Sequence, residues 1–138
     1  MSLSPSNNAR DSGHLGSKLK LLDLSEQLIV SAMPVMDKIP RIHRYRYGAA
    51  LERALYELPN LVIQASTAKT KTKVYSLYDH IEYIHSLLRI GAERKIISRR
   101  WVGHIMRSCD LEVNNNGLLK QISAMCAVWR ASIKESGK

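Results

Sequence analysis

The sequence predicts an all-α fold, an antiparallel four-helix bundle. Apolar residues recur at intervals of three and four over most of the chain, and no stretch shows the period of two that is typical of strands. The breaks between these stretches are short and rich in proline, glycine, asparagine or other polar residues. Amphipathic helices joined by short connections pack as antiparallel neighbours around a shared core.

The chain of 138 residues suits one domain with one core. Residues 1–17 are rich in serine, asparagine and glycine, and we expect them to form a disordered N-terminal arm. The helical bundle is predicted over residues 18–134, and residues 135–138 are predicted to be a C-terminal tail.

The first two helices are separated by a proline. Ser17 is the predicted N-cap of helix one, which Pro34 should kink and Pro40 should end, because the residue before a proline avoids the helical region. Helix two should start just after Pro40 and carry an apolar stripe from Tyr47 to Ala65, with a second kink at Pro59. The polar stretch STAKTKTK over residues 66–73 is predicted to be a loop.

The second half of the chain predicts two more helical segments and a break. Apolar residues from Val74 to Leu88 define helix three, which ends near Gly91. Helix four should start near Ser98, a candidate N-cap. The run Asn114 to Gly117 is a strong break, so helix four is either interrupted there or followed by a fifth helix.

Charge is the most informative property of the composition. The net charge is +9 with a pI near 9.8, which favours an anionic partner such as nucleic acid, an acidic protein surface or a lipid layer. The positive charge gathers in three clusters: residues 38–53 (net +4), 69–73 (net +3) and 89–107 (net +5). On an ideal helix Arg46 and Arg53 share an outward face, and Tyr45 is a candidate for stacking on a base.

Two patterns suggest chemistry. Glu82 and His85 form an E-x-x-H pair, but no second such pair exists, and a core histidine is the commoner explanation, so we predict no metal and no other cofactor. Arg99 and His104 form R-x4-H, which resembles the motif of the all-helical HEPN ribonucleases. There an arginine and a histidine from two protomers converge on a phosphodiester, and the arginine holds the phosphate while the histidine assists proton transfer. This ribonuclease is kept as an alternative function.

The sequence shows no signal peptide and no membrane span, so we expect a cytoplasmic protein. The N-terminus lacks the apolar middle of a signal peptide, and charged residues and Pro34 interrupt the longest apolar stretch, Leu19 to Met36. Cys109 and Cys126 show no metal-binding spacing and are expected to be buried free thiols in a reducing compartment.

A resemblance to a known family arises from PVMDKIPRIHRYRYG, followed by LERAL and VIQA. This stretch resembles the four-helix-bundle family of the accessory variability determinant of diversity-generating retroelements, whose relatives are encoded in intervening sequences of ribosomal RNA genes. The signature matches here are Ile39, Pro40, Arg41, Arg44, Tyr45, Gly48 and Glu52. Weaker landmarks are Leu88-Arg89, Ile97-Ser98 and Val128-Trp129, so the resemblance spans Leu19 to Ile133. Pro59, Ala49 and the stretch Glu112 to Gly117 depart from the family pattern.

The resemblance implies a non-enzymatic protein with no catalytic residues. It implies a homopentamer that binds reverse transcriptase and template RNA and supports mutagenic cDNA synthesis and homing. By position, Arg41, Arg44 and Arg46 are the candidates for nucleic-acid or partner binding. Charge clustering alone adds Arg53, Arg89, Arg94, Lys95, Arg99 and Arg100. A plain helical scaffold that binds only protein is the other alternative.

Overall fold

The computed structural model describes residues 12–68, 70–107 and 117–136, and all regular secondary structure in these ranges is helical. The predicted all-α class is therefore confirmed for this part of the chain. The elements are α1 (Ser12–Asp37), α2 (Arg41–His43), the π-helical turn η2 (Arg44–Gly48), α3 (Ala49–Ala68), α4 (Lys71–Glu93), α5 (Arg99–Met106) and α6 (Leu118–Ser136).

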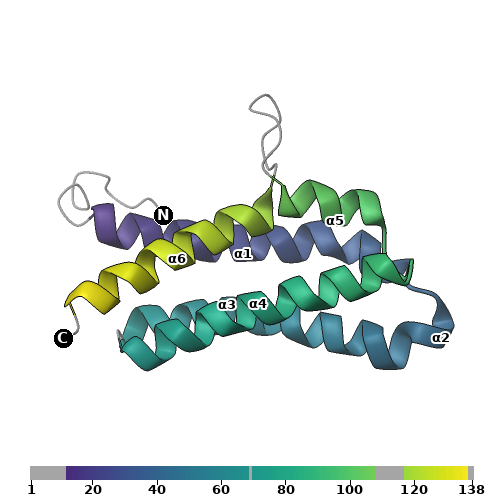
Figure 1. Cartoon of the computed structure of the whole chain (residues 1–138), viewed down its shortest axis with the longest axis horizontal. Coiled ribbons are helices and arrows are strands. Elements are labelled where there is room, and N and C mark those ends of the chain that lie inside the picture. Colours follow the sequence, from purple (N-terminus) through teal and green to yellow (C-terminus); the bar gives the residue numbers. More distant parts are fainter. Residues whose placement is uncertain (1–11, 69, 108–116, 137–138) are drawn as a thin grey trace, which may run out of the picture.

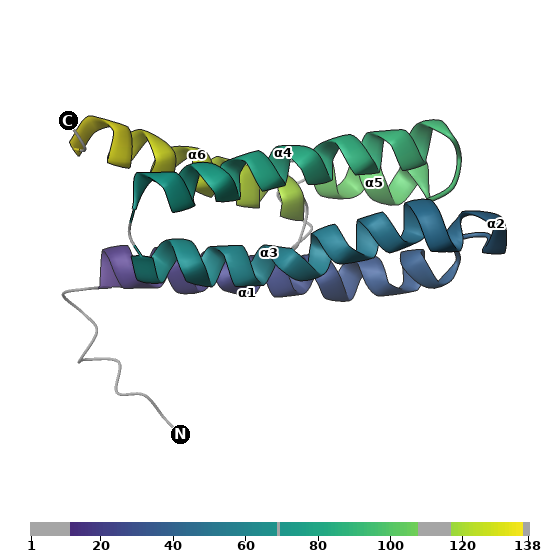
Figure 2. The same ribbon diagram turned by 90° about the horizontal axis from the view of Figure 1, so that it is seen from below.

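The long helices lie lengthwise beside one another (Figures 1 and 2). Helix α3 contacts α1 and α4, and α6 contacts the same two helices, while α5 packs against α4 and α6. Their apolar stripes meet in one core, because each helix turns its three-and-four pattern inward. The fully buried side chains include Leu28 of α1, Leu55 of α3, Ile84 of α4, Ile105 of α5 and Leu119 of α6.

Helix α1 begins at Ser12, earlier than the predicted start at Lys18, so Ser17 is not its N-cap. The sequence pattern favoured a later start because Gly13 and Gly16 are poor helix formers. Each glycine lowers helix stability by only about 1 kcal/mol, which a long helix tolerates. The rest of the predicted arm, residues 1–11, and the tail residues 137–138 lie outside the described residues.

The predicted loop over residues 66–73 is wrong for most of its length. Helix α3 runs to Ala68, where the Ser66 hydroxyl donates to the peptide oxygen of Val62 (2.8 Å). Helix α4 begins at Lys71, because Thr70 caps it by accepting a hydrogen bond from the Lys73 amide (3.2 Å). A run of polar residues is typical both of a loop and of an exposed helix surface. The cap at Thr70 fixes where α4 begins.

The prolines have two different roles. Pro40 precedes α2 with extended torsion angles (φ −57°, ψ 145°), so it separates α1 from the next helix as predicted. Pro34 and Pro59 lie inside α1 and α3, which continue on both sides of them.

The predicted fourth helix is two helices. Helix α5 starts after Ser98, whose hydroxyl accepts from the Trp101 amide (3.1 Å), so the predicted N-cap is confirmed. Helix α6 starts after Gly117, which has φ 65° and donates its amide to the His104 oxygen (3.0 Å). Residues 108–116, with Cys109 and the three asparagines, lie outside the described part.

Cys126 is a buried free thiol, and burial raises its pKa to about 12.

No helix in the described ranges is both long enough and apolar enough to cross a membrane.

Candidate nucleic-acid interface

The segment that joins α1 to α3, residues 38–48, is called the junction here, and it packs on a buried isoleucine. Ile39 is 2% exposed and packs under η2, where a Cβ added to Gly48 would lie 3.5 Å from the Ile39 Cδ1. Arg44 Nη2 donates to the Ile39 oxygen (3.4 Å), which ties the π turn to the residue before Pro40. The apolar members of the motif thus hold the junction, and Arg41, Arg44 and Arg46 stay exposed.

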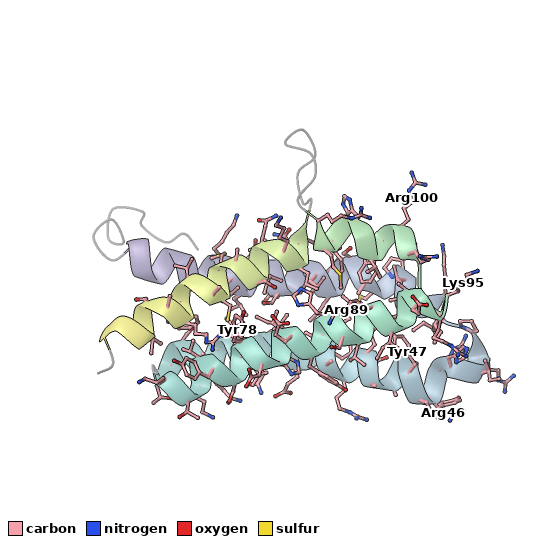
Figure 3. All side chains as sticks on the ribbon, viewed as in Figure 1. Arg46, Tyr47, Tyr78, Arg89, Lys95 and Arg100 are labelled. Carbon is pink, nitrogen blue, oxygen red and sulfur yellow. The ribbon has the colours of Figure 1, made fainter. Side chains whose placement is uncertain are left out.

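Tyr47 fastens this junction to α4 (Figure 3). Its hydroxyl donates to the Leu87 oxygen, and its ring lies against Gly91, the only residue type without a Cβ to obstruct it. Burial raises the pKa of Tyr47 to about 12, so the hydroxyl stays a donor at neutral pH. The sequence expectation that Tyr47 packs inward is confirmed.

The end of α4 is a tight turn that presents cations. Lys95 has φ 60°, the Ile96 amide donates to the Gly91 oxygen (2.8 Å), and the Lys95 amide donates to the Ala92 oxygen (3.1 Å). These bonds form a Schellman motif, which closes the last turn of a helix. Ser98 then starts α5 at once, so few residues separate the cations of the turn from those of the first turn of α5.

The junction and the turn meet at one end of the molecule, opposite the start of α1 (Figures 1 and 3). We call the exposed cations gathered there the basic end: Lys38, Arg41, Arg44, Arg46, Arg94, Lys95, Arg99 and Arg100. Only Asp37 and Glu93 contribute carboxylates to residues 37–48 and 93–100. Among the residues that the structure describes, none of these cations forms an ion pair, so the charge is available to an anion.

The remaining candidate residues lie elsewhere. Arg53 is exposed on α3, and Arg89 is exposed on α4, where its Nη2 donates to the Ser86 hydroxyl (3.4 Å). Of the predicted cluster at residues 69–73, Lys71 and Lys73 lie in the first turn of α4, away from the basic end (Figure 1), and Lys69 lies outside the described residues. Lys73 Nζ there donates to Gln64 (3.1 Å). The structure therefore brings together residues 38–46 and 94–100, which are parts of two of the three charge clusters.

A hollow of about 370 Å³ lies on the outer face of η2 and α3, beside the basic end. Its lining residues are Arg44, Tyr45, Ala49, Glu52, Arg53 and Tyr56. Arg44, Tyr45 and Arg53 are among the residues predicted from the sequence, whereas Tyr56 is not. The spacing of residues 45, 49, 52 and 56 places them on one helix face, and that signal could have found it.

The two residues of the R-x4-H pattern do not point toward one site within a single chain. Arg99 and His104 are both exposed on α5, but residues five apart on an ideal helix point about 140° away from each other. A shared phosphate site for this pair would need a residue from another chain.

His85 contacts two neighbours without forming a metal site. Its Nδ1 is 3.8 Å from Glu82 Oε1 and its Nε2 is 3.4 Å from the Ser123 hydroxyl on α6. Burial lowers the pKa of His85, the nearby Glu82 carboxylate opposes this shift, and the charge of Arg89 adds to it. The described residues contain no group of three possible metal ligands. Ser123 lies within α6 and is half-buried.

Comparison of the chain with protein-family models, curated proteins and solved structures finds no match. The resemblance carried by residues 34–48 therefore stays a prediction from the sequence.

Proposed function

We propose that this protein is a non-enzymatic, RNA-binding accessory of a diversity-generating retroelement. In this proposal it binds the reverse transcriptase and the template RNA and supports mutagenic cDNA synthesis and homing. The observation that carries RNA binding is the basic end, where cations from two distant segments gather on one surface. The polymerase partner rests on the resemblance of the motif around Pro40.

The proposal includes the finer architecture. The molecule is an antiparallel four-helix bundle in which α5 and α6 together take the place of an interrupted fourth helix. The resemblance further implies a homopentamer, and the proposal places it in the cytoplasm. Five basic ends on one particle would raise the affinity for a long RNA, since each additional contact is intramolecular.

RNA binding is tested by fluorescence anisotropy with labelled single-stranded RNA over a range of salt concentrations. Phosphate contacts release counterions, so the logarithm of the affinity should fall linearly with the logarithm of salt, by roughly 0.7 for each contact on a single strand. Arg46→Glu and Arg100→Glu should weaken binding and flatten this slope. Lys20→Glu is the matched control, because Lys20 is an exposed cation of α1 that lies away from the basic end. Equal affinities of all three variants would contradict the proposed surface.

Lys95→Gly separates binding from folding. Lys95 has the left-handed conformation that glycine adopts without strain, so the substitution should stabilise the fold while it removes one cation of the basic end. We expect weaker RNA binding by a variant that unfolds at a higher urea concentration. Unchanged RNA affinity in this variant would remove Lys95 from the site.

The partner is tested by affinity purification of the tagged protein from its native cells at moderate salt. A reverse transcriptase together with one discrete RNA would support the accessory role. The polymerase without RNA would support the scaffold alternative, and the absence of both would contradict the proposal. Cleavage of RNA by the wild type but not by His104→Ala would favour the ribonuclease instead.

A further inference from the structure

Two exposed tyrosines mark the hollow on η2 and α3. Tyr45 is 82% exposed and Tyr56 is 46% exposed, although burying an aromatic ring against the core would stabilise the protein. The other tyrosine of this motif, Tyr47, is turned inward and bonded to α4. The chain therefore holds one ring of the motif in the core and leaves its neighbour in solvent.

The hollow is elongated along the helix. Tyr45 and Tyr56 are eleven residues apart, which corresponds to roughly 16 Å along a helix axis. A short run of nucleotides can place one base on each tyrosine over that length. Ala49 lies between them and presents only a methyl group, which leaves the space above it open.

The charged residues of the hollow suit a nucleic-acid strand. Arg44 and Arg53 line it together with Tyr45 and Tyr56, and the one carboxylate is that of Glu52. The two guanidinium groups can hold phosphates, and the Glu52 oxygens can accept hydrogen bonds from the amino groups of unpaired bases. Arg44 belongs both to this hollow and to the basic end, so one strand can run from one to the other.

The lining favours bases over a protein side chain. A binding pocket for a protein anchor is well packed and desolvated, and this hollow has a single alanine as its aliphatic lining. Aromatic rings beside a basic groove are typical of proteins that bind single-stranded nucleic acid, because every base has a face that can stack.

We propose that this hollow binds unpaired bases of single-stranded RNA, with Tyr45 and Tyr56 each stacking on one base. This inference rests on the RNA binding proposed above and adds to it the strand state of the ligand and the residues that select it. Duplex RNA has its bases stacked inside the helix and cannot use these tyrosines.

The test compares a single-stranded RNA with a strand of the same length that carries abasic sites. Base stacking on an aromatic side chain corresponds to about fivefold or more in affinity. Tyr45→Ala and Tyr56→Ala should each weaken binding of the normal strand by about fivefold and leave binding of the abasic strand unchanged. Tyr45→Phe keeps the ring and should bind like the wild type. Tyr83→Ala is the matched control, because Tyr83 is 49% exposed but lies on α4, outside the hollow.

Three results would overturn the inference, and they have different meanings. If the wild type binds no RNA, the proposed function fails as well. If RNA binding depends on Arg46 but Tyr45→Ala behaves like Tyr83→Ala, the RNA-binding function stands and the base site is wrong. If Tyr45→Ala leaves RNA binding intact but disrupts self-association or the polymerase complex, the hollow is a protein-docking surface.

Discussion

Replacing Gly91 by alanine tests how the basic junction is fastened to the rest of the protein. A Cβ at position 91 would lie 2.6 Å from Tyr47 Cζ and 2.9 Å from Ile97 Cγ1, and still nearer to the Tyr47 hydroxyl oxygen. Atoms at such distances overlap, so either the ring or the α4–α5 turn has to move. Movement of the ring also breaks the hydrogen bond from Tyr47 to the Leu87 oxygen.

The expected magnitude combines three effects. Alanine is a better helix former than glycine by about 1 kcal/mol, which favours the variant. Overpacking costs about 1–3 kcal/mol, and the lost hydrogen bond costs about 1 kcal/mol. The free energy of unfolding of Gly91→Ala should therefore fall by about 2 kcal/mol.

The assay is urea unfolding followed by far-ultraviolet circular dichroism. Gly103→Ala is the control, because the nearest atoms to a Cβ there belong to the outer end of the exposed Arg107 side chain and not to a ring or the backbone. That variant should lose less stability than Gly91→Ala. In a Tyr47→Ala background, Gly91→Ala should cost less than in the wild type, since the ring is gone. A Gly91→Ala protein as stable as Gly103→Ala would refute this account of the junction.

Three further predictions concern stability. Lys95→Gly should raise the free energy of unfolding by about 1 kcal/mol because it removes a left-handed residue with a Cβ, whereas Lys95→Ala should not, as measured by urea unfolding. Ser98→Ala should lower it by about 1 kcal/mol, visible as a lower melting temperature, because the Trp101 amide loses its capping partner. Burial lowers the pKa of His85 from 6.5, so the folded protein binds a proton at this ring less readily than the unfolded chain does. The free energy of unfolding should therefore be unaffected by His85 above pH 6.5 and should fall as the pH drops below 6.5. His85→Gln should show a flatter pH dependence of unfolding, and an equal dependence in both proteins would exclude His85 as the cause.

Much of the secondary structure could be predicted because it depends on local periodicity. The stripe from Tyr47 to Ala65 and the cap at Ser98 need only residues within one or two turns, and both are found in the structure. The start of α1 at Ser12 and the short connection at Thr70 were missed, since glycines and polar threonines and lysines look alike in a loop and on an exposed helix surface.

The residues of the candidate site could be predicted from the sequence, but their gathering at one end of the molecule could not. The amino-acid sequence by itself determined which segments are basic, that Pro40 separates two helices and that Tyr47 fits an apolar stripe. Tertiary packing decided that residues 38–46 and 94–100 share one end, and that Lys71 and Lys73 lie away from it. It also decided that Lys95 takes a left-handed conformation and that Tyr47 lies on Gly91. Periodicity reports which face of a helix is buried, whereas the proximity of distant segments follows from how long helices fold back on one another, which no local pattern encodes.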